Sequence, residues 1–208
     1  MKLFISFEGI DGCGKSTQIK LLSEKLTLNS INNVIIREPG DTLISDKIRD
    51  ILLDEKNNIG NISETMLFLA ARSQLVDEKI IPFYKNGNVV LCDRFIDSTT
   101  AYQGYGRNLN IEMINKLNIF ATKNIIPDIT FILDLNHNIA YDRLKSNNMD
   151  RMELIGLDFL NTVSEGYRKI ALDNKNRCKI IDCNQKDIMT VHNEVVDIFN
   201  LQCGKDVL

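Results

Sequence analysis

A glycine-rich stretch near the N-terminus is the first part of the sequence that could do chemistry. Residues 9–17 read G-I-D-G-C-G-K-S-T and fit the phosphate-loop pattern G-x-x-x-x-G-K-[ST]. Backbone N–H groups of such a loop, together with a helix N-terminus, create positive potential that suits a polyphosphate. Lys15 could neutralise β- and γ-phosphate oxygens, and the Ser16 hydroxyl could occupy one position on Mg²⁺. The alternative is a glycine turn that binds no ligand.

The residues on either side of this stretch predict the elements that position it. Residues 3–7 form a short apolar run, which indicates a buried strand. Ile19, Leu22 and Leu26 then recur at helical spacing. The order of strand, glycine loop and helix is the one that a phosphate loop requires, so the flanking sequence favours a bound phosphate over an empty turn.

Charged residues follow two further apolar runs. Arg37 and Glu38 precede the turn-forming pair Pro39-Gly40, and Asp93 and Arg94 close the run at 89–92. An acid at the end of a buried strand beside a phosphate loop can hold Mg²⁺, and a neighbouring arginine can neutralise transferring phosphoryl oxygens. Apolar residues would avoid the desolvation cost of such an ion pair, so function explains Asp93 and Arg94 better than structure does.

Three residues on predicted helices leave two interpretations open. Phe68 and Arg72 are four residues apart and share a helix face, where a flat ring could stack on Phe68 while the guanidinium donates to its carbonyl. A core phenylalanine beside an arginine paired with an acid fits the same spacing, and is the commoner arrangement. Arg49 could contact a ligand or lie on a solvated helix face.

The alternation of apolar runs and helical patterns predicts an α/β fold. Apolar strands that are covered on both faces imply a parallel sheet with right-handed crossovers, in which ligands gather at the carboxyl ends of the strands. Further strands are expected at 34–36, 89–92, 129–135 and 178–181, and helices at 43–53, 64–83, 111–124, 139–145, 157–174 and 188–201.

The composition limits the classes of protein to which this chain could belong. The 208 residues suit one domain spanning 1–208, and 44% hydrophobic residues with 25% charged residues are ordinary for a soluble protein. A net charge of −3 argues against a large nucleic-acid or membrane surface. No apolar stretch approaches the roughly 18 residues of a membrane span.

The five cysteines lack metal-site spacing and are expected to be reduced thiols of a cytoplasmic protein. Cys13 could have a lowered pKa among the loop amides, although an inert small side chain is the simpler reading.

Five motifs together resemble the bacterial thymidylate kinases, which are P-loop nucleoside monophosphate kinases. They occur in the order of that family and cover nearly the whole chain, and the last three are specific to it. They are F-E-G-I-D-G-C-G-K-S-T at 7–17, R-E-P-G at 37–40, A-A-R-S-Q-L at 70–75, D-R-F-I-D-S-T-T-A-Y-Q-G at 93–104 and D-R-M-E at 150–153.

The resemblance implies an enzyme that transfers the γ-phosphate of ATP to dTMP with Mg²⁺, giving dTDP and ADP for dTTP biosynthesis. It implies a three-layer P-loop fold, with a central five-stranded parallel sheet flanked by helices and a short mobile lid at about 141–152. It also implies a homodimer built from packed helices. The ATP-binding residues would be Gly9, Ile10, Asp11, Gly12, Cys13, Gly14, Lys15, Ser16, Thr17 and Arg143.

The resemblance also assigns the acceptor and metal residues. Phe68 would stack on thymine, Arg72 and Gln103 would bond its polar edge, and Tyr102 would pack under the deoxyribose. The remaining dTMP-binding residues would be Asp11, Arg37, Glu38, Pro39, Arg49, Arg94 and Ser98, with the metal near Ser16, Asp11 and Asp93.

Catalysis would rest on Lys15, Arg94 and Asp11 with an arginine of the lid. Family members without a loop arginine, as here with Cys13 in that place, carry it in the lid, where Arg143 and Arg151 are both candidates. Asp41 stands where the family usually has a second glycine, which leaves the conformation of that turn open.

Two other functions are alternatives to phosphoryl transfer from ATP to dTMP. A kinase for another nucleotide or deoxynucleoside would share the loop, and rates on several monophosphates would separate it. A nucleotide-dependent switch would need D-x-x-G after the third strand and N-K-x-D for guanine. Here Ile96 stands in place of that glycine, and residues 174–177 read N-K-N-R, which argues against a switch.

Overall fold

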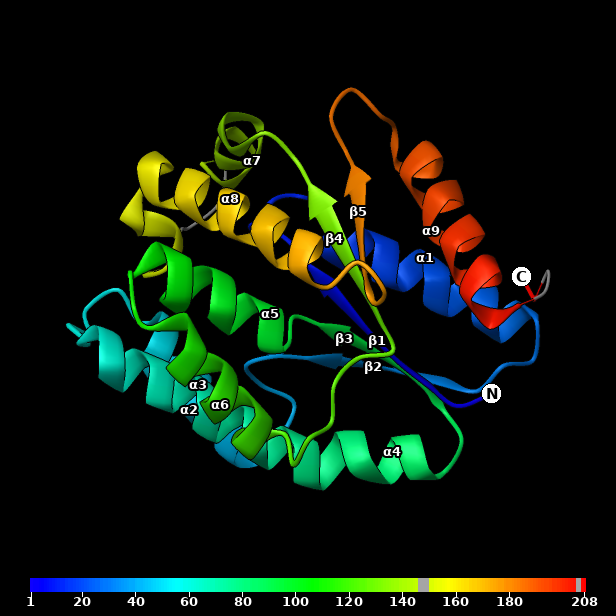
Figure 1. Cartoon of the computed structure of the whole chain (residues 1–208), viewed down its shortest axis with the longest axis horizontal. Helices are drawn as coiled ribbons and strands as arrows, with labels where there is room; N and C mark the ends of the chain where they lie inside the picture. Colours follow the sequence, from blue (N-terminus) through cyan, green and yellow to red (C-terminus); the bar gives the residue numbers. More distant parts are fainter. Residues whose placement is uncertain (146–149, 205–206) are drawn as a thin grey trace.

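The fold is built on a parallel sheet whose strands carry the predicted motifs at their carboxyl ends. The computed structural model describes residues 1–145, 150–204 and 207–208. Within these residues the sheet has five strands in the order β2-β3-β1-β4-β5, and every neighbouring pair is parallel (Figure 1). The strands are β1 (Leu3–Glu8), β2 (Asn33–Arg37), β3 (Val89–Asp93), β4 (Ile129–Asp134) and β5 (Cys178–Asp182).

Helices cover both faces of this sheet, as the apolar strands predict, and give the three layers that the family resemblance implies. The helices α1 and α9 pack together on one face, while α8 and the group α3 to α6 lie on the other (Figure 1). In the described part of the chain, no helix is both long and apolar enough to cross a membrane. The α-helices are α1 (Lys15–Leu28), α2 (Leu43–Leu53), α3 (Asn61–Leu75), α4 (Ile81–Lys85), α5 (Ile96–Thr99), α6 (Ile111–Ala121), α7 (His137–Leu144), α8 (Leu157–Asp173) and α9 (Ile188–Cys203).

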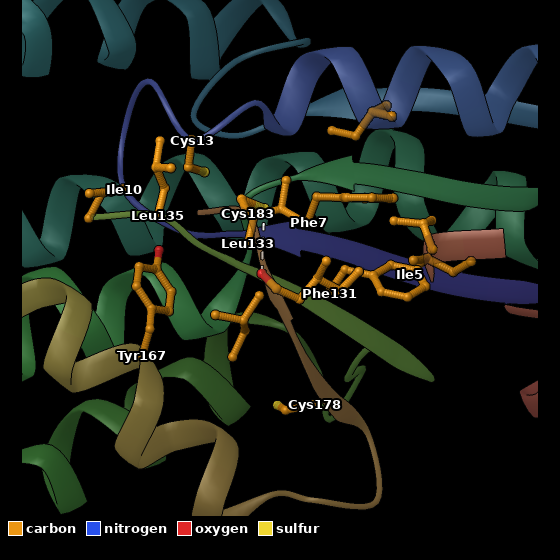
Figure 2. Close-up of a cluster of buried hydrophobic side chains, with 14 of the residues drawn as sticks. Ile5, Phe7, Ile10, Cys13, Phe131, Leu133, Leu135, Tyr167, Cys178 and Cys183 are labelled. Atoms are coloured by element: carbon orange, nitrogen blue, oxygen red, sulfur yellow. Dashed lines mark hydrogen bonds between the residues drawn. The ribbon is translucent and has the colours of Figure 1, made fainter. Parts of the chain in front are cut away.

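The core packs the central strands against α1 and α8. The rings of Phe7 on β1 and Phe131 on β4 lie 5.1 Å apart between centroids, and Figure 2 shows them in one cluster with Tyr167 of α8. Leu22 and Leu26 of α1 are fully buried, which confirms the apolar helical spacing read from the sequence. This packing holds the end of β1, and therefore the loop that follows it, at a fixed place.

Two helices differ from the expected ranges. The helix expected over 64–83 is α3, then a π-helical turn η1 (Val76–Ile80), and then α4. Pro82 lies at the start of α4, directly after the π-helical turn, within one continuous helical run over residues 61–85. The helix α6 ends before the expected residue 124 because Lys123 and Asn124 have φ angles of 53° and 65°, which a right-handed helix cannot continue.

The helical segment 96–106 was not predicted from the sequence. Here α5 continues into a π-helical stretch, η2 (Thr100–Gly106), which packs closely on α8. A Cβ at Gly166 of α8 would lie 2.8 Å from Cδ2 of Tyr105, so glycine is required for this approach. The segment matters for the site because it carries Tyr102 and Gln103.

Candidate active site

The phosphate loop occupies the place between the end of β1 and the start of α1. Gly9 has a φ of 131°, and a Cβ there would lie 2.5 Å from the carbonyl oxygen of Leu133. A Cβ at Gly12 would lie 2.7 Å from the carbonyl oxygen of Ala140. Both glycines are therefore required by close backbone approach, and the loop leads directly to the N-terminus of α1, where backbone N–H groups attract anions.

Lys15 and Ser16 are the first residues of α1. Their side chains form hydrogen bonds with the loop and with the end of β3. The Lys15 ammonium donates to the carbonyl oxygens of Gly9 and Ile10 at 3.2 and 3.1 Å. The Ser16 hydroxyl donates to Oδ2 of Asp93, at the end of β3, over 3.0 Å. The structure thus brings Lys15, Ser16 and Asp93 together, as the sequence predicts, although they come from two different segments.

Arg94 stands at the centre of a polar cluster. It has a φ of 73°, a left-handed conformation that is unusual for a residue with a side chain. Its Nη2 donates to Oδ1 of Asp11 at 2.6 Å and to the Tyr102 hydroxyl at 3.1 Å, while its Nη1 donates to Ser98 and Tyr167. These four partners hold the guanidinium in one orientation.

The charge of this cluster keeps Asp11 ionised. Desolvation in the cleft would raise the pKa of Asp11, but the nearby Arg94 and Lys15 cations outweigh it and hold that pKa well below its usual range. Lys15 Nζ lies 3.6 Å from Oδ1 of Asp11. Two cations and one anion therefore meet here, which leaves net positive charge for an anionic ligand.

Glu8, the last residue of β1, supports this cluster through hydrogen bonds. It was not predicted as a site residue from the sequence. Its carboxylate accepts from Ser98 Oγ at 2.6 Å, from the Tyr167 hydroxyl at 3.0 Å and from the backbone N–H of Phe95 at 2.7 Å. Complete burial and the negative charge of Asp97 raise the pKa of Glu8 to about 7. The signal was available, because an acid closing the apolar run of β1 follows the same rule that singled out Asp93.

A cavity of about 90 Å³ lies beside Arg94 and is lined by the predicted base-binding residues. Phe68 lines it as a half-buried side chain, and Arg72 and Gln103 line it too. The structure therefore brings Phe68 and Arg72 to the cavity that Arg94 borders. The full lining is Asp11, Glu38, Pro39, Arg49, Leu53, Phe68, Arg72, Arg94, Ser98, Thr99, Tyr102, Gln103, Asp150 and Met152.

Arg72 fits both interpretations that the sequence left open. It is 1% exposed, and its Nη2 lies 2.5 Å from Oε1 of Glu38, so it is paired with an acid. The same nitrogen donates to Thr99 Oγ1 and Phe95 O, and Nη1 donates to Asn118. The Arg72 Nε, however, is buried without a partner in the described structure. A buried unpaired donor on a cavity wall is suited to a ligand acceptor.

Glu38 is harder to ionise than an exposed acid. Burial raises the pKa of Glu38 above its ordinary value, and the opposing attraction of Arg72 only partly offsets this effect. Its side chain is 2% exposed. Glu38 therefore serves as a buried partner for Arg72 rather than as a solvated acid.

The turn after β2 shows how Asp41 replaces a glycine. Asp41 adopts a φ of 64°, and its Oδ2 accepts a hydrogen bond from the backbone N–H of Arg37 at 2.6 Å. Asp46 in turn accepts from the Asp41 N–H at 3.0 Å. Aspartate tolerates this left-handed conformation when such local bonds form, so the turn is kept. Arg49 Nη1 donates to Pro39 O at 2.8 Å, which ties the next helix to the turn.

A second cavity, of about 500 Å³, is lined by the phosphate loop and shares several residues with the first. Lys15, Ser16, Arg37 and Asp93 line it together with Arg143 of α7. One cavity is thus mainly cationic and polar, and the other is partly aromatic. Both cavities are lined by Asp11, Glu38, Arg49 and Arg94, so ligands bound in the two cavities would meet at these residues.

The two candidate lid arginines occupy different places. Arg143 Nη1 donates to the Gly12 carbonyl at 2.9 Å, beside the phosphate loop. Arg151 Nη1 lies 2.7 Å from Oε2 of Glu64, and its Nε donates to Leu52 O at 2.6 Å. The structure therefore brings Arg143 to the loop, and it holds Arg151 against α2 and α3. Part of the predicted lid, 146–149, lies outside the described residues.

Cys13 does not have the lowered pKa that its place in the loop suggested. Its side chain is 4% exposed, and burial raises the pKa of the thiol despite the nearby Lys15 cation. Figure 2 shows Cys13 near Ile10 and Leu135 at the loop end of the core. The thiol is therefore an inert packing group, and the simpler reading of the sequence holds.

Comparisons with known proteins agree with this geometry. A sequence profile of the thymidylate kinase family matches residues 7–195. The thymidylate kinase of Thermoanaerobacter sp. (strain X514) is 45% identical over 195 residues, which are 94% of this chain and 96% of that protein. The thymidylate kinase of Thermosipho africanus (strain TCF52B) is 52% identical over 169 residues, or 81% of this chain and 84% of its own.

A solved structure shows the same likeness. The crystal structure of thymidylate kinase from Ehrlichia chaffeensis superposes with a TM-score of 0.77 at 38% sequence identity, covering 95% of this chain and 97% of that one. A phosphate loop beside a second, partly aromatic cavity on a parallel sheet defines a phosphate-loop kinase of small molecules. The chain belongs to the thymidylate kinase family. It is an ATP-dependent nucleoside monophosphate kinase that phosphorylates dTMP.

Proposed function

We propose that ATP binds over the phosphate loop and dTMP binds in the smaller cavity, so that the two phosphate groups meet at Arg94. The observation that carries this proposal is the sharing of Asp11 and Arg94 between the two cavities, with Lys15 on one side and Phe68 on the other. Phosphoryl transfer needs donor and acceptor phosphates aligned in one line, and this arrangement suits that need.

The donor phosphates are assigned to the loop and to Arg143. Loop N–H groups and Lys15 would cradle the phosphates, and Arg143 is preferred over Arg151 as the lid arginine because it already contacts the loop. The full donor set is Gly9, Ile10, Asp11, Gly12, Cys13, Gly14, Lys15, Ser16, Thr17 and Arg143.

The side chains around Ser16 fit a magnesium ion. Mg²⁺ takes oxygen ligands and keeps several waters, so it needs only one or two protein ligands besides phosphate. The hydroxyl of Ser16 and the carboxylate of Asp93 are 3.0 Å apart, and Asp11 lines the same cavity. We assign Ser16 and Asp93 as the nearest ligands, with Asp11 beside them. A bound Mg²⁺ would screen charge between the phosphates.

The acceptor is assigned to the smaller cavity. Phe68 would stack on the base, Arg72 and Gln103 would bond its polar edge, and Tyr102 would pack under the sugar. Arg37, Arg49 and Arg94 would hold the acceptor phosphate, since all three line the cationic cavity. Glu38, Pro39 and Ser98 complete the acceptor set.

The chemistry asks for alignment and charge neutralisation rather than for a general base. An acceptor phosphate is already ionised near pH 7, so its oxygen can attack without losing a proton to the protein. Lys15 and Arg94 would stabilise the charge that spreads over the transferring group. Asp11 fits the role of holding Arg94 in place, because it bonds the guanidinium directly.

A panel of acceptors tests this assignment. ADP release would be measured with ATP, Mg²⁺ and dTMP, dUMP, dCMP or dGMP in turn. We expect dTMP to be used far better than dCMP and dGMP. Equal rates on all four acceptors would contradict the assignment of Phe68 and Arg72 to base binding. ATP hydrolysis that depends on a protein partner and not on an acceptor would favour a nucleotide-dependent switch.

We also propose a homodimer that buries the face formed by α2, α3 and α6. These helices pack side by side (Figure 1) and expose large apolar side chains, namely Ile44, Ile51, Ile62, Met66, Met113 and Phe120. Several exposed apolar side chains on neighbouring helices favour a protein–protein interface there. Sedimentation of the wild type and of Phe120→Asp would test it, and a wild-type monomer would contradict it.

Three further features stay predictions from the sequence. We propose that residues 1–208 act as one kinase domain whose lid covers about 141–152. The five cysteines are free in the described structure, which fits the reduced thiols expected of a cytoplasmic protein. The acidic balance, with a net charge of −3, fits small-molecule substrates without a nucleic-acid partner.

A further inference from the structure

Glu64, in the first turn of α3, is a fully buried carboxylate with several partners. Its Oε1 accepts from Gln103 Nε2 at 3.0 Å and from Arg107 Nε at 3.2 Å. Its Oε2 accepts from Arg107 Nη2 at 3.0 Å and lies 2.7 Å from Arg151 Nη1. These donors belong to η2, to the residue just after it and to the segment before η3, so one carboxylate connects three parts of the chain.

The surroundings keep Glu64 ionised. Burial alone would raise the pKa of Glu64, but the hydrogen bonds from Arg107, Gln103 and Arg151 outweigh burial and lower that pKa. An ionised carboxylate has no proton to give and can only accept hydrogen bonds. Every group that faces Glu64 must therefore present a donor.

This requirement decides which way the Gln103 amide points. The oxygen and nitrogen ends of an amide have nearly the same shape, so packing does not distinguish them. The Glu64 carboxylate does, because it accepts from the amide nitrogen and would repel the amide oxygen. The Gln103 oxygen is thereby directed away from Glu64, and in the described structure no group donates a hydrogen bond to it.

Gln103 lines the same cavity as Arg72, and the two side chains offer opposite hydrogen-bonding groups. Arg72 has only donors, one of which, Nε, is buried and unpaired. Gln103, oriented by Glu64, contributes an acceptor. A pyrimidine with a 4-keto oxygen beside a protonated ring nitrogen matches this pair, whereas cytosine presents an amino donor at that position.

We propose that Glu64 is a positioning residue that fixes the Gln103 amide and thereby selects a 4-keto pyrimidine monophosphate over a 4-amino one. The inference rests on the proposed placement of the acceptor base between Phe68 and Arg72. It differs from a purely structural role for Glu64, in which the carboxylate only neutralises Arg107 and Arg151. In that case any change at Glu64 would alter stability without altering the choice of base.

Three variants separate the two roles. Glu64→Gln can donate as well as accept and so frees the Gln103 amide to turn, whereas Glu64→Asp keeps a group that only accepts. Arg107→Gln removes another partner of the same carboxylate and is the matched control. Each is purified as the full chain, its melting temperature is recorded, and kcat/KM is measured for dTMP and dCMP with ATP and Mg²⁺.

We expect the dTMP to dCMP ratio of kcat/KM to fall at least about tenfold in Glu64→Gln, because discrimination by oriented polar groups is lost. The ratio should stay near that of the wild type in Glu64→Asp and Arg107→Gln, even where melting temperatures fall. A folded Glu64→Gln protein with the wild-type ratio would overturn the inference.

A variant at Gln103 keeps the inference testable if Glu64→Gln does not fold. Gln103→Leu leaves Glu64 neutralised by both arginines and removes the oriented acceptor, so the ratio should fall by a similar factor. An unchanged ratio would again overturn the inference. Arg72→Met serves as the reference. An unchanged dTMP to dCMP ratio in this variant would reject the placement of the base itself. A ratio that falls in Arg72→Met but in none of the other variants would reject only the role of Glu64.

Discussion

The Arg94 Nη2 atom lies 2.6 Å from Oδ1 of Asp11, and this pair stands where the two cavities join. The sheet explains the contact. Strands β1 and β3 are parallel neighbours with Phe7 paired to Asp93, so the residues that follow both strands emerge at the same edge. A loop acid and a strand-end arginine that are far apart in the sequence therefore form one junction.

Replacing Arg94 by alanine should reduce turnover strongly. The transferring phosphoryl group would lose a donor that Asp11, Ser98 and Tyr102 hold in place, and one such preorganised donor is worth about 10²–10³ in kcat. Steady-state ADP release with dTMP would measure the loss, and circular dichroism would check the fold.

Arg168→Ala is the matched control for this experiment. Arg168 pairs with Asp134 on the surface, is 46% exposed and lines neither described cavity, so turnover should remain at the wild-type level. Wild-type turnover in Arg94→Ala would remove this residue from the mechanism.

The buried Glu8 should make stability depend on pH near neutrality. Burial and the charge of Asp97 raise its pKa in the folded protein from 4.5 to about 7. Between these values the folded state binds more protons than the unfolded state, so the free energy of unfolding should fall as pH rises through that window. The fall is limited to a few kcal/mol, since each pKa unit corresponds to about 1.4 kcal/mol.

Urea unfolding at several pH values from about 4.5 to 8 would measure this effect, and Glu8→Gln provides the comparison. The variant has no carboxyl to titrate, so the pH slope in this window should become shallower. Identical slopes in both proteins would show that Glu8 titrates in its ordinary range.

The sequence predicted the sheet and the strand-end residues better than the contacts between them. Apolar runs and the glycine loop follow local rules, so the strands and the places of Lys15 and Asp93 were accessible. Glu8 was missed although it closes an apolar run as Asp93 does. Glu64 was not identified because the burial of its carboxylate depends on partners such as Arg107 that are distant in sequence. Local periodicity carries no information on such pairs.

The segment 96–106 shows a second limit of sequence reasoning. Its small and polar residues lack a helical apolar stripe, and yet it is helical because it packs on α8 through the close approach at Gly166. Tertiary packing here overrides local propensity. The family resemblance had named Tyr102 and Gln103 in this segment without indicating that it is a helix.

Arg72→Ala should affect stability as well as the choice of base. Removing the guanidinium leaves Glu38, which is 2% exposed, buried without its partner, and breaking a buried ion pair costs about 3–5 kcal/mol. The double variant Arg72→Met with Glu38→Gln removes both charges and should be the more stable of the two. Denaturant unfolding of both proteins tests this order, and a single variant as stable as the wild type would contradict the buried pair.

Divalent cations should be required for turnover, and the side chains around Ser16 should set that requirement. Chelation of Mg²⁺ by EDTA should abolish ADP release, and added Mg²⁺ should restore it. Ser16→Ala and Asp93→Asn each remove an oxygen donor from the pair that is 3.0 Å apart, so both should raise the Mg²⁺ concentration for half-maximal rate, with a larger effect where the negative charge is lost. Thr27→Ala, which removes a hydroxyl from the exposed end of α1, should leave that concentration unchanged. Equal magnesium dependence in all four proteins would place the ion elsewhere.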